Sequence, residues 1–232
     1  MSSIEKLLKE PGFAIVDIAD LKKFKTLRDT FLKKMGFETN MEIESFRKKL
    51  SLMKNSEINK AMLNLLSFNE ASEIMIESCK DIVEELCGKE LLIQRRANTI
   101  FNLPGKDQRR QWPHYELMSG ISPHTFILWA PFHDLDDDDG VFYLTQQKSY
   151  ELIELEHEKG LVNGPEILNK PHNEKPVKLK FGEVIIFNPF ILHGNVNFQS
   201  DLSRVACSVR FQNKHKPLMQ KNSDFFKLHT LS

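Results

Sequence analysis

The sequence lacks the features that mark nucleic-acid-binding, membrane-spanning and secreted proteins. Its 232 residues carry no net charge, because 32 lysines and arginines balance 32 aspartates and glutamates. This balance argues against a diffuse electrostatic grip on nucleic acid or on an anionic membrane. No apolar run approaches the roughly 20 residues of a membrane span, and charged residues follow Met1 too soon for a secretory signal. We therefore expect a cytoplasmic protein with a small-molecule partner, and the sequence leaves its oligomeric state open.

Cysteine is also scarce. The three cysteines, Cys79, Cys87 and Cys207, are odd in number and lack the spacing of a disulfide framework or a metal site. This pattern suits a reducing compartment, and we predict three buried thiols. The length fits one domain over 1–232, because single cores stop growing at roughly 250–300 residues.

Residues 1–90 are predicted to be mostly helical, with one early strand at 12–17. Apolar residues recur at three- and four-residue steps after Asp20, a candidate N-cap, and again before Gly88, a candidate residue just past a helix end. The two stretches are Leu21, Phe24, Leu27 and Phe31, and then Met75, Cys79, Ile82 and Leu86. Helices with one apolar stripe must bury it, and a sheet is the expected partner.

From Leu91 onward, short runs of β-type residues alternate with turns. The predicted strands are 91–103, 125–135, 141–145, 184–190 and 204–211. Five or more strands after a helical region indicate an α+β fold, with helices supporting a jelly roll, or double-stranded β-helix, over 91–215. Residues 156–178 predict a long surface loop, either a lid or a tolerated excursion, and 216–232 predict a tail.

Two adjacent candidates for metal binding lie in the segment Trp112-Pro113-His114-Tyr115-Glu116. If this segment is extended, His114 and Glu116 project from the same face, because side chains alternate along a strand. On its own an H-x-E triplet is weak evidence, since a solvated histidine beside a surface glutamate is the commoner arrangement. Its meaning depends on a third ligand elsewhere in the chain.

His193 supplies a candidate third ligand. It follows an almost wholly apolar run, Val184 to Leu192, which predicts a buried strand that delivers the histidine at its end. The alternative is a core histidine bonded to the backbone. Two neutral imidazoles and one carboxylate on one face of an iron ion leave positions open for dioxygen and an organic co-substrate. The three residues thus predict the ligand set of a non-haem Fe(II) oxygenase.

The strand predicted at 204–211 has two unlike faces. One carries Arg204, Ala206, Ser208 and Arg210, and the other carries Val205, Cys207 and Val209. An inward face bearing guanidinium groups requires an anionic partner, because an unpaired buried charge is very costly. A dicarboxylate is such a partner, since Arg204 can grip a carboxylate with two parallel donors. The alternative is a solvent-exposed face with ordinary surface charges.

Three other clusters are weaker candidates. The acidic run 136–139 before Gly140 lacks the spacing of a calcium loop and predicts a solvated turn. His133 and Asp134 are adjacent, which places them on opposite faces of a strand and argues against a shared metal. The pairs at 95–96 and 109–110 are arginines, and they predict either solvated edges or contacts to an anionic group of a substrate.

These motifs resemble the phytanoyl-CoA dioxygenase-like family of Fe(II)/2-oxoglutarate-dependent oxygenases. The segments that carry the resemblance are Leu7 to Val16, Asn102 to Gly105, Trp129 to Asp134 with Gly140, Gln146 to Ser149, and Gly182 to Phe187 with His193 and Arg204. The resemblance implies iron bound by His114, Glu116 and His193, and the distal carboxylate of 2-oxoglutarate bound by Arg204. Ser208, Arg210 and Trp129 are expected to complete the co-substrate site. Two departures are Glu116, where Asp is more usual, and Ala206, where a serine is often found.

The implied reaction uses O2 to convert 2-oxoglutarate into succinate and CO2 while a small substrate is oxidised, with hydroxylation as the expected outcome. Residues 113–120 and 129–140 are also similar to oxygenases of aminoglycoside and surface-carbohydrate pathways. This similarity implies a polar substrate such as a sugar or a secondary-metabolite intermediate. Two alternatives stay open. One is a cupin-type metalloenzyme, which 182–197 also resembles, and the other is a non-catalytic jelly roll that binds a carboxylate.

Overall fold

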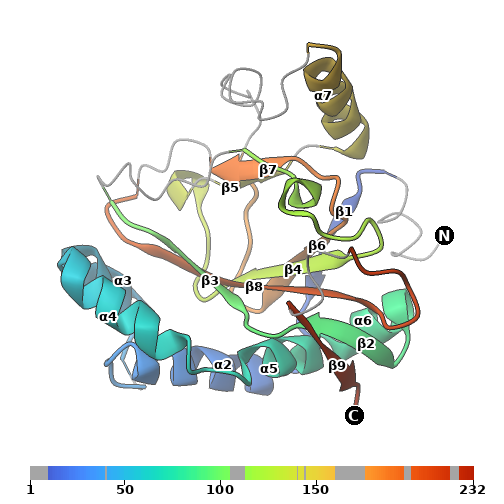
Figure 1. Cartoon of the computed structure of the whole chain (residues 1–232). Coiled ribbons are helices and arrows are strands. Elements are labelled where there is room, and N and C mark those ends of the chain that lie inside the picture. Colours follow the sequence, from blue (N-terminus) through green and yellow to red (C-terminus); the bar gives the residue numbers. More distant parts are fainter. Residues whose placement is uncertain are drawn as a thin grey trace.

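The computed structural model describes residues 10–39, 41–104, 113–139, 141–143, 145–159, 176–195, 200–219 and 225–232. A layer of helices covers one face of a large antiparallel sheet, and a two-stranded sheet lies over the opposite face (Figure 1). This arrangement confirms the predicted α+β class, a jelly-roll core with supporting N-terminal helices.

The strands are β1 (Phe13–Asp17), β2 (Glu90–Gln94), β3 (Asn98–Asn102), β4 (Phe126–Pro131), β5 (Val141–Tyr143), β6 (Glu183–Phe187), β7 (His193–Asn195), β8 (Arg204–Asn213) and β9 (Phe226–Thr230). The helices are α2 (Leu21–Lys34), α3 (Ile43–Leu52), α4 (Asn55–Leu65), α5 (Ala71–Ser78), α6 (Lys80–Cys87) and α7 (Gln146–Glu158). Two 3-10 turns, η2 (Glu116–Ser119) and η3 (Asp137–Asp139), flank β4.

Strands that are distant in the sequence lie side by side. The large sheet has the order β1-β6-β4-β8-β2-β9, and β3 pairs with the first half of β8. The small sheet pairs β5 with β7, which places Tyr143 opposite His193. Long-range pairing of this kind is what a jelly roll requires.

Strand β8 divides the core into two parts. The residues of one face, Val205, Cys207, Val209 and Phe211, join the cluster that contains the helices. On the other face Arg204 and Ser208 are buried, and Ala206 packs between the two sheets. The alternation of side chains along β8 therefore predicted its two faces correctly. The face that carries Arg204 is buried rather than solvent-exposed.

The first helix forms as the sequence predicts. Asp20 caps α2, because its side chain accepts a hydrogen bond from the Lys23 amide at 2.9 Å. The apolar stripe of α2 packs on the sheet, and the Phe31 ring centre lies 5.1 Å from that of Phe132 and 5.7 Å from that of Phe101. The helical layer thus buries its apolar face against the strands.

The second predicted helix is in fact two helices. Cys79 separates α5 from α6 with φ −115° and ψ 22°, outside helical geometry. The apolar period continues across this break, so it hid the break from sequence reasoning. Gly88 ends α6 with φ +72°, a conformation that favours glycine. Cys79, Cys87 and Cys207 are free and buried, as predicted.

Two predicted strands and the predicted tail need correction. The run 91–103 forms β2 and β3 rather than one strand, because the chain leaves the sheet at Arg95, whose amide donates to the Phe225 carbonyl at 2.9 Å. The run 184–190 ends as a strand at Phe187. Residues 216–232 are more than a tail, because β9 pairs with β2 and extends the large sheet.

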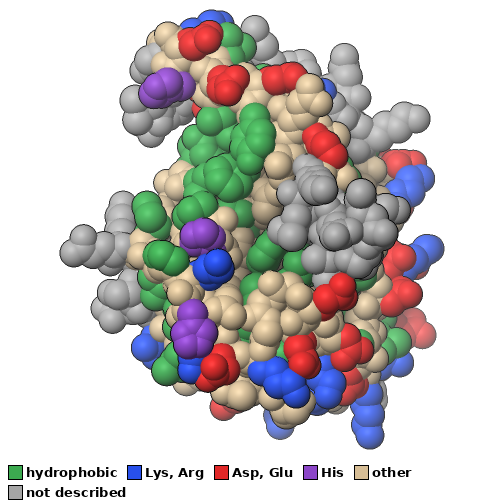
Figure 2. Space-filling view, turned by 90° about the vertical axis from the view of Figure 1, so that its right-hand side faces the viewer, with side chains coloured by type: hydrophobic (Ala, Val, Ile, Leu, Met, Phe, Trp, Pro, Cys, Tyr) green, Lys and Arg blue, Asp and Glu red, His purple; other side chains and the backbone are tan. Residues whose placement is uncertain are grey.

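The predicted loop 156–178 overlaps helix α7, which runs to Glu158, while 160–175 lie outside the described residues. α7 stands apart from the large sheet at the top of Figure 1, and Figure 2 shows apolar side chains gathered below it. Tyr150 of α7 packs edge-on against Phe190 at 5.5 Å between ring centres. In the described ranges, no helix is both long and apolar enough to cross a membrane.

Candidate metal centre

His114 and His193 lie side by side because their backbones form an isolated antiparallel bridge. The His114 amide donates to the His193 carbonyl at 2.9 Å, and the His193 amide donates to the His114 carbonyl at 3.0 Å. Their ring centres are 4.3 Å apart. The bridge thus brings together two imidazoles that are far apart in the sequence.

Helix α7 braces the turn that precedes His193. The Leu192 amide donates to Ser149 Oγ at 2.9 Å, and Asn188 Nδ2 donates to Gln146 Oε1 at 2.5 Å. His193 is therefore delivered by a braced turn and opens β7, rather than ending one long buried strand as predicted. The 146–149 segment, which carried part of the family resemblance, forms the first turn of this helix.

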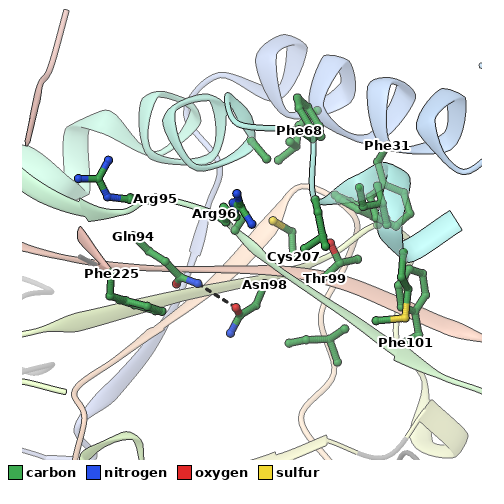
Figure 3. A pocket seen from close by; sticks show the side chains of 18 residues that line it. Phe31, Phe68, Gln94, Arg95, Arg96, Asn98, Thr99, Phe101, Cys207 and Phe225 are labelled. Atoms are coloured by element: carbon green, nitrogen blue, oxygen red, sulfur yellow. Dashed lines mark hydrogen bonds between the residues drawn. The ribbon is translucent and has the colours of Figure 1, made fainter. Parts of the chain in front are cut away.

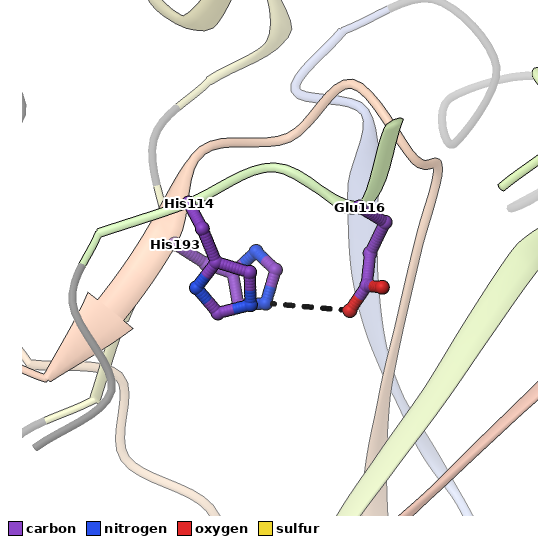
Figure 4. Close-up of side chains that lie close together, drawn as sticks. All are labelled: His114, Glu116 and His193. Atoms are coloured by element: carbon purple, nitrogen blue, oxygen red, sulfur yellow. Dashed lines mark ion pairs between the residues drawn. The ribbon is translucent and has the colours of Figure 1, made fainter. Parts of the chain in front are cut away.

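Glu116 begins η2 instead of continuing a strand. Tyr115 is extended, with φ −120° and ψ 149°, and the side chains of His114 and Glu116 still point toward one place (Figure 4). Glu116 Oε1 lies 3.9 Å from His193 Nε2. One ligand atom from each of the three side chains lies within 4.8 Å of the others, so the predicted triad converges.

Arg210 holds the carboxylate of Glu116. Its Nε and Nη2 donate to Glu116 Oε2 at 2.8 and 2.5 Å, and its Nη1 donates to Gln94 Oε1 at 3.1 Å. One carboxylate oxygen is thus committed to the guanidinium, and the other faces His193. Sequence reasoning assigned Arg210 to the co-substrate, and the structure places it both against a metal-ligand candidate and in the wall of the adjoining cavity. The reason is that η2 brings Glu116 beside this end of β8, which no local pattern indicates.

The donor set fits a divalent transition metal. Burial, with added effects from His114 and Arg210, holds the pKa of His193 well below its usual value, so the ring is neutral at pH 7, as metal ligation requires. His193 Nδ1 lies 3.0 Å from the Ile191 carbonyl oxygen. This contact assigns the proton to Nδ1 and leaves Nε2 for a metal. Two imidazoles and one carboxylate match the triad of non-haem iron sites.

Two aromatic rings hold the His193 imidazole in place. Tyr143 stacks on it with an interplanar angle of 8° and 5.3 Å between ring centres. The ring centre of Phe187 lies 4.7 Å from that of His193. Rings packed this closely restrict rotation of the imidazole, which keeps its Nε2 directed at Glu116.

A narrow cavity of about 20 Å³ adjoins Glu116 and His193. Its walls include all four residues predicted to bind the co-substrate, Arg204, Ser208, Arg210 and Trp129. The structure therefore brings two of the predicted metal ligands, Glu116 and His193, and these four side chains around one space. The Arg204 guanidinium carbon lies 6.0 Å from the centre of the Trp129 ring.

Arg204 is a buried cation, with 1% of its surface exposed. Its Nη2 donates to Asn102 Oδ1 at 2.6 Å and to Asn195 Oδ1, and its Nη1 donates to the Asp139 carbonyl. Burial lowers the pKa of Arg204 to about 10, so it stays charged at neutral pH. A charge buried this deeply favours an anionic ligand in the cavity.

Sequence reasoning missed two polar groups of this cavity, Tyr143 Oη and Asn195 Nδ2. Both are buried and have no hydrogen-bond partner among the described residues. Asn195 lies two residues after His193 on β7, so alternation could have placed it on the same face. Tyr143 carried no such signal, because only the pairing of β5 with β7 brings it to His193. Buried donors without partners mark room for a polar ligand.

His133 is a buried core histidine, whereas the sequence argued only against its sharing a metal with Asp134. Its Nδ1 lies 2.7 Å from the Asp134 carbonyl oxygen, and its Nε2 accepts from the Val205 amide at 3.2 Å. Both ring nitrogens are therefore committed to the backbone. Burial, reinforced by the positive charge of Arg47, lowers the pKa of His133 to about 4.

The acidic run is only partly the solvated turn that was predicted. Asp136, Asp137 and Asp138 are exposed, but Asp139 is buried and pairs with Arg47 at 2.9 Å. The partner comes from α3, so the sequence around the run gives no sign of it. The arginines at 95–96 are exposed, and those at 109–110 lie outside the described residues.

No protein-family model matches the sequence, and no curated protein matches it either. Solved structures do match. ThoJ, a non-haem monooxygenase in complex with nickel, aligns with a TM-score of 0.58 and 13% identity over 93% of this chain and 78% of its own. HygX from Streptomyces hygroscopicus, with nickel and 2-oxoglutarate bound, aligns with a TM-score of 0.53 and 11% identity over 100% and 96%. The chain shares the fold of these metalloproteins.

A third match is SnoN, described as a non-haem alpha-ketoglutarate-dependent epimerase from nogalamycin biosynthesis. It aligns with a TM-score of 0.50 and 12% identity over 90% of this chain and 80% of its own. At sequence identities this low, the structural alignments establish the fold alone. The chemistry of this chain follows from its own residues.

Proposed function

We propose that the whole chain, 1–232, forms one Fe(II)- and 2-oxoglutarate-dependent dioxygenase domain that oxidises a small polar metabolite. The convergence of His114, Glu116 and His193 beside a cavity lined by buried donors carries this proposal. The fold shared with HygX, whose structure holds nickel and 2-oxoglutarate, supports it.

In this proposal His114, Glu116 and His193 hold the iron and leave its remaining positions open. When bound, the iron supplies, with 2-oxoglutarate and dioxygen, the oxidising power for a C–H bond, and succinate and CO2 are released. The protein's own part is to fix the ligands. Arg210 fixes the orientation of the Glu116 carboxylate, and the Ile191 carbonyl fixes the tautomer of His193.

Arg204 is the proposed anchor for the distal carboxylate of 2-oxoglutarate. Tyr143 Oη and Asn195 Nδ2 are placed to donate to the same anion, because both line the cavity with Arg204. Ser208 and Trp129 line this space as well and position the co-substrate within it. Because the cavity measures only about 20 Å³, the side chains around Arg204 must move apart when 2-oxoglutarate binds.

The proposed reaction is hydroxylation of a hydroxyl-rich molecule, such as a sugar or a secondary-metabolite intermediate. The similarity of 113–120 and 129–140 to oxygenases of aminoglycoside and surface-carbohydrate pathways supports this substrate class. So does the fold shared with SnoN, which comes from nogalamycin biosynthesis. Analysis of the product distinguishes hydroxylation from the other C–H oxidations that the same metal-ligand set supports.

The test is succinate formation under air with Fe(II), ascorbate and 2-oxoglutarate over a panel of sugars, aminoglycosides and acyl compounds. Wild type is expected to form succinate at a rate that depends on the added compound, and the His193→Ala and Arg204→Ala variants are expected to form none. The proposal fails if wild type makes no succinate and calorimetry shows no metal-dependent binding of 2-oxoglutarate. A cupin-type enzyme or a carboxylate-binding protein would then be the better reading.

A further inference from the structure

A second and much larger cavity lies between the helical layer and the sheet. It measures about 620 Å³ and is lined by residues of α2, α4, β2, β3 and the start of α5. Figure 3 shows Phe31 and Phe68 reaching it from the helical side, and Thr99, Phe101 and Cys207 from the strand side. This volume is typical of a site for a small organic molecule.

Strands β3 and β8 separate this cavity from the metal centre. Thr99 pairs with Cys207 in the ladder, and both side chains face the helices. The next residue of β8, Ser208, faces the metal-centre cavity instead. Asn98 and Ile100 line both spaces and form the partition. A co-substrate at Arg204 therefore leaves the larger cavity empty.

The walls of the larger cavity are mainly apolar. Aromatic rings from both layers line it, and the Cys207 thiol is neutral because burial raises its pKa to about 12. Met62 and Leu66 also line it and are 39% and 52% exposed, so apolar surface continues to the mouth. Exposed apolar surface around a cavity marks a place where an apolar body is buried on binding.

The charge in the lining has one sign. Arg95 and Arg96 line the cavity, and no aspartate or glutamate does among the described residues. Figure 3 shows both guanidinium groups on the helix side of Gln94. A positive group at the edge of an apolar cavity favours a ligand with a negative group at one end.

We infer that this cavity binds an amphiphile with an aliphatic or aromatic body and one anionic group, of which a medium-chain carboxylate is the simplest case. The body lies among the phenylalanine rings, and the anion lies at Arg96. This site goes beyond the proposed oxygenase reaction, because none of the metal-ligand candidates lines it.

Gln94 connects the two sites. It lines the larger cavity, its Nε2 donates to Asn98 Oδ1 at 2.8 Å, and its Oε1 accepts from Arg210 at 3.1 Å. Arg210 in turn holds Glu116, so a ligand that contacts Gln94 lies two hydrogen bonds from a candidate metal ligand. The two sites are neighbours, although each binds a different molecule in this proposal.

The test is calorimetric titration of decanoate into the full chain loaded with Fe(II) and 2-oxoglutarate under argon. One decanoate is expected to bind per chain. The same affinity is expected for metal-free protein, so this result stands or falls separately from the oxygenase proposal. Decyltrimethylammonium, which has the same chain and the opposite charge, is expected to bind at least tenfold more weakly.

Two variants locate the site. Arg96→Glu is expected to weaken decanoate binding about tenfold or more and to strengthen binding of decyltrimethylammonium. The matched control is Lys49→Glu, which reverses an exposed charge outside the cavity and is expected to change neither affinity. Ala71→Phe places a ring in the cavity and is expected to abolish decanoate binding.

Four results would overturn the inference. The first three are no decanoate binding to wild type, equal affinity for the anionic and cationic amphiphiles, and decanoate binding that Arg96→Glu leaves unchanged. Arg96 is exposed, so its variant keeps the test decisive even if Ala71→Phe does not fold. Competition between decanoate and 2-oxoglutarate would also contradict the inference, because it would make the two cavities one site.

Discussion

The regions around His133 and His193 look alike by burial and differ in what the ring nitrogens face. His133 lies just after β4 with 2% of its surface exposed, and His193 opens β7 with 7% exposed. The backbone takes both nitrogens of His133. It takes one nitrogen of His193, and the other faces Glu116 at 3.9 Å.

The difference shows what separates a metal ligand from a core histidine. Both pKa values are lowered by burial, so neither burial nor a shifted pKa identifies the ligand. The partners of the ring nitrogens do, because backbone groups take both nitrogens of His133, while Nε2 of His193 faces the Glu116 carboxylate. A metal ligand needs one ring nitrogen that no other group takes.

The largest difference is expected when each of these two histidines is replaced and Fe(II) binding is compared. His193→Ala removes a ligand and should weaken Fe(II) binding by more than the roughly 10–100-fold typical of residues that only support ligands. His133→Gln should leave Fe(II) affinity unchanged. Anaerobic calorimetry with Fe(II) measures both, and equal losses in the two variants would remove the distinction between the two regions.

The next largest effect concerns the anion site beside His193. Arg204→Ala should raise the dissociation constant of 2-oxoglutarate about 100-fold, because truncating a buried charge pair costs roughly 2–5 kcal/mol. Tyr143→Phe should raise it a few-fold, since one neutral hydrogen bond contributes about 1 kcal/mol. Titration of 2-oxoglutarate into metal-loaded variants that keep the wild-type circular dichroism spectrum measures this. An unchanged affinity in Arg204→Ala would place the co-substrate elsewhere.

A smaller effect is expected from the support of Glu116. Arg210→Met should weaken metal binding roughly 10–100-fold, because the carboxylate loses the guanidinium that orients it. Arg210→Lys keeps the charge and one donor, so its loss should be smaller. If both variants lose 2-oxoglutarate affinity while metal affinity is unchanged, Arg210 is a co-substrate ligand, as the sequence alone suggested.

The sequence predicted those parts of the site that depend on alternation and on residue type. Arg204 and Ser208 share the inward face of β8, and His193 follows an apolar run, as expected. The bridge between His114 and His193, the η2 turn at Glu116 and the pairing of Arg210 with Glu116 were not predictable. Each depends on how distant segments meet, which no local pattern encodes.

The fold shows the same limit. Asp20 and Gly88 marked a helix start and a helix end correctly, because capping is a local property. β9 was missed, because the alternation Phe226-Lys227-Leu228-His229-Thr230 becomes a strand only beside β2. Local chemistry is readable in the sequence, and long-range pairing is not.

The smallest effect on function, and a clear one on stability, is expected for His133. Its pKa is about 4 in the folded state against 6.5 ordinarily, so the folded protein binds fewer protons between these values. The contribution of His133 to the free energy of unfolding is therefore complete above about pH 6.5. As the pH falls toward 4, the free energy of unfolding decreases by about 3 kcal/mol. Urea unfolding of wild type and His133→Gln across this range should show the steeper acid loss in wild type. Parallel curves would contradict the assignment.

The most direct measurement of the central claim is the visible absorption of the protein under argon with Fe(II), with 2-oxoglutarate, and with both. Chelation of the iron by the co-substrate gives a charge-transfer band. The band is predicted only when both are present, in wild type and His133→Gln, and not in His193→Ala. A band of equal strength in His193→Ala, or none in wild type that binds Fe(II), would contradict a metal centre built from His114, Glu116 and His193.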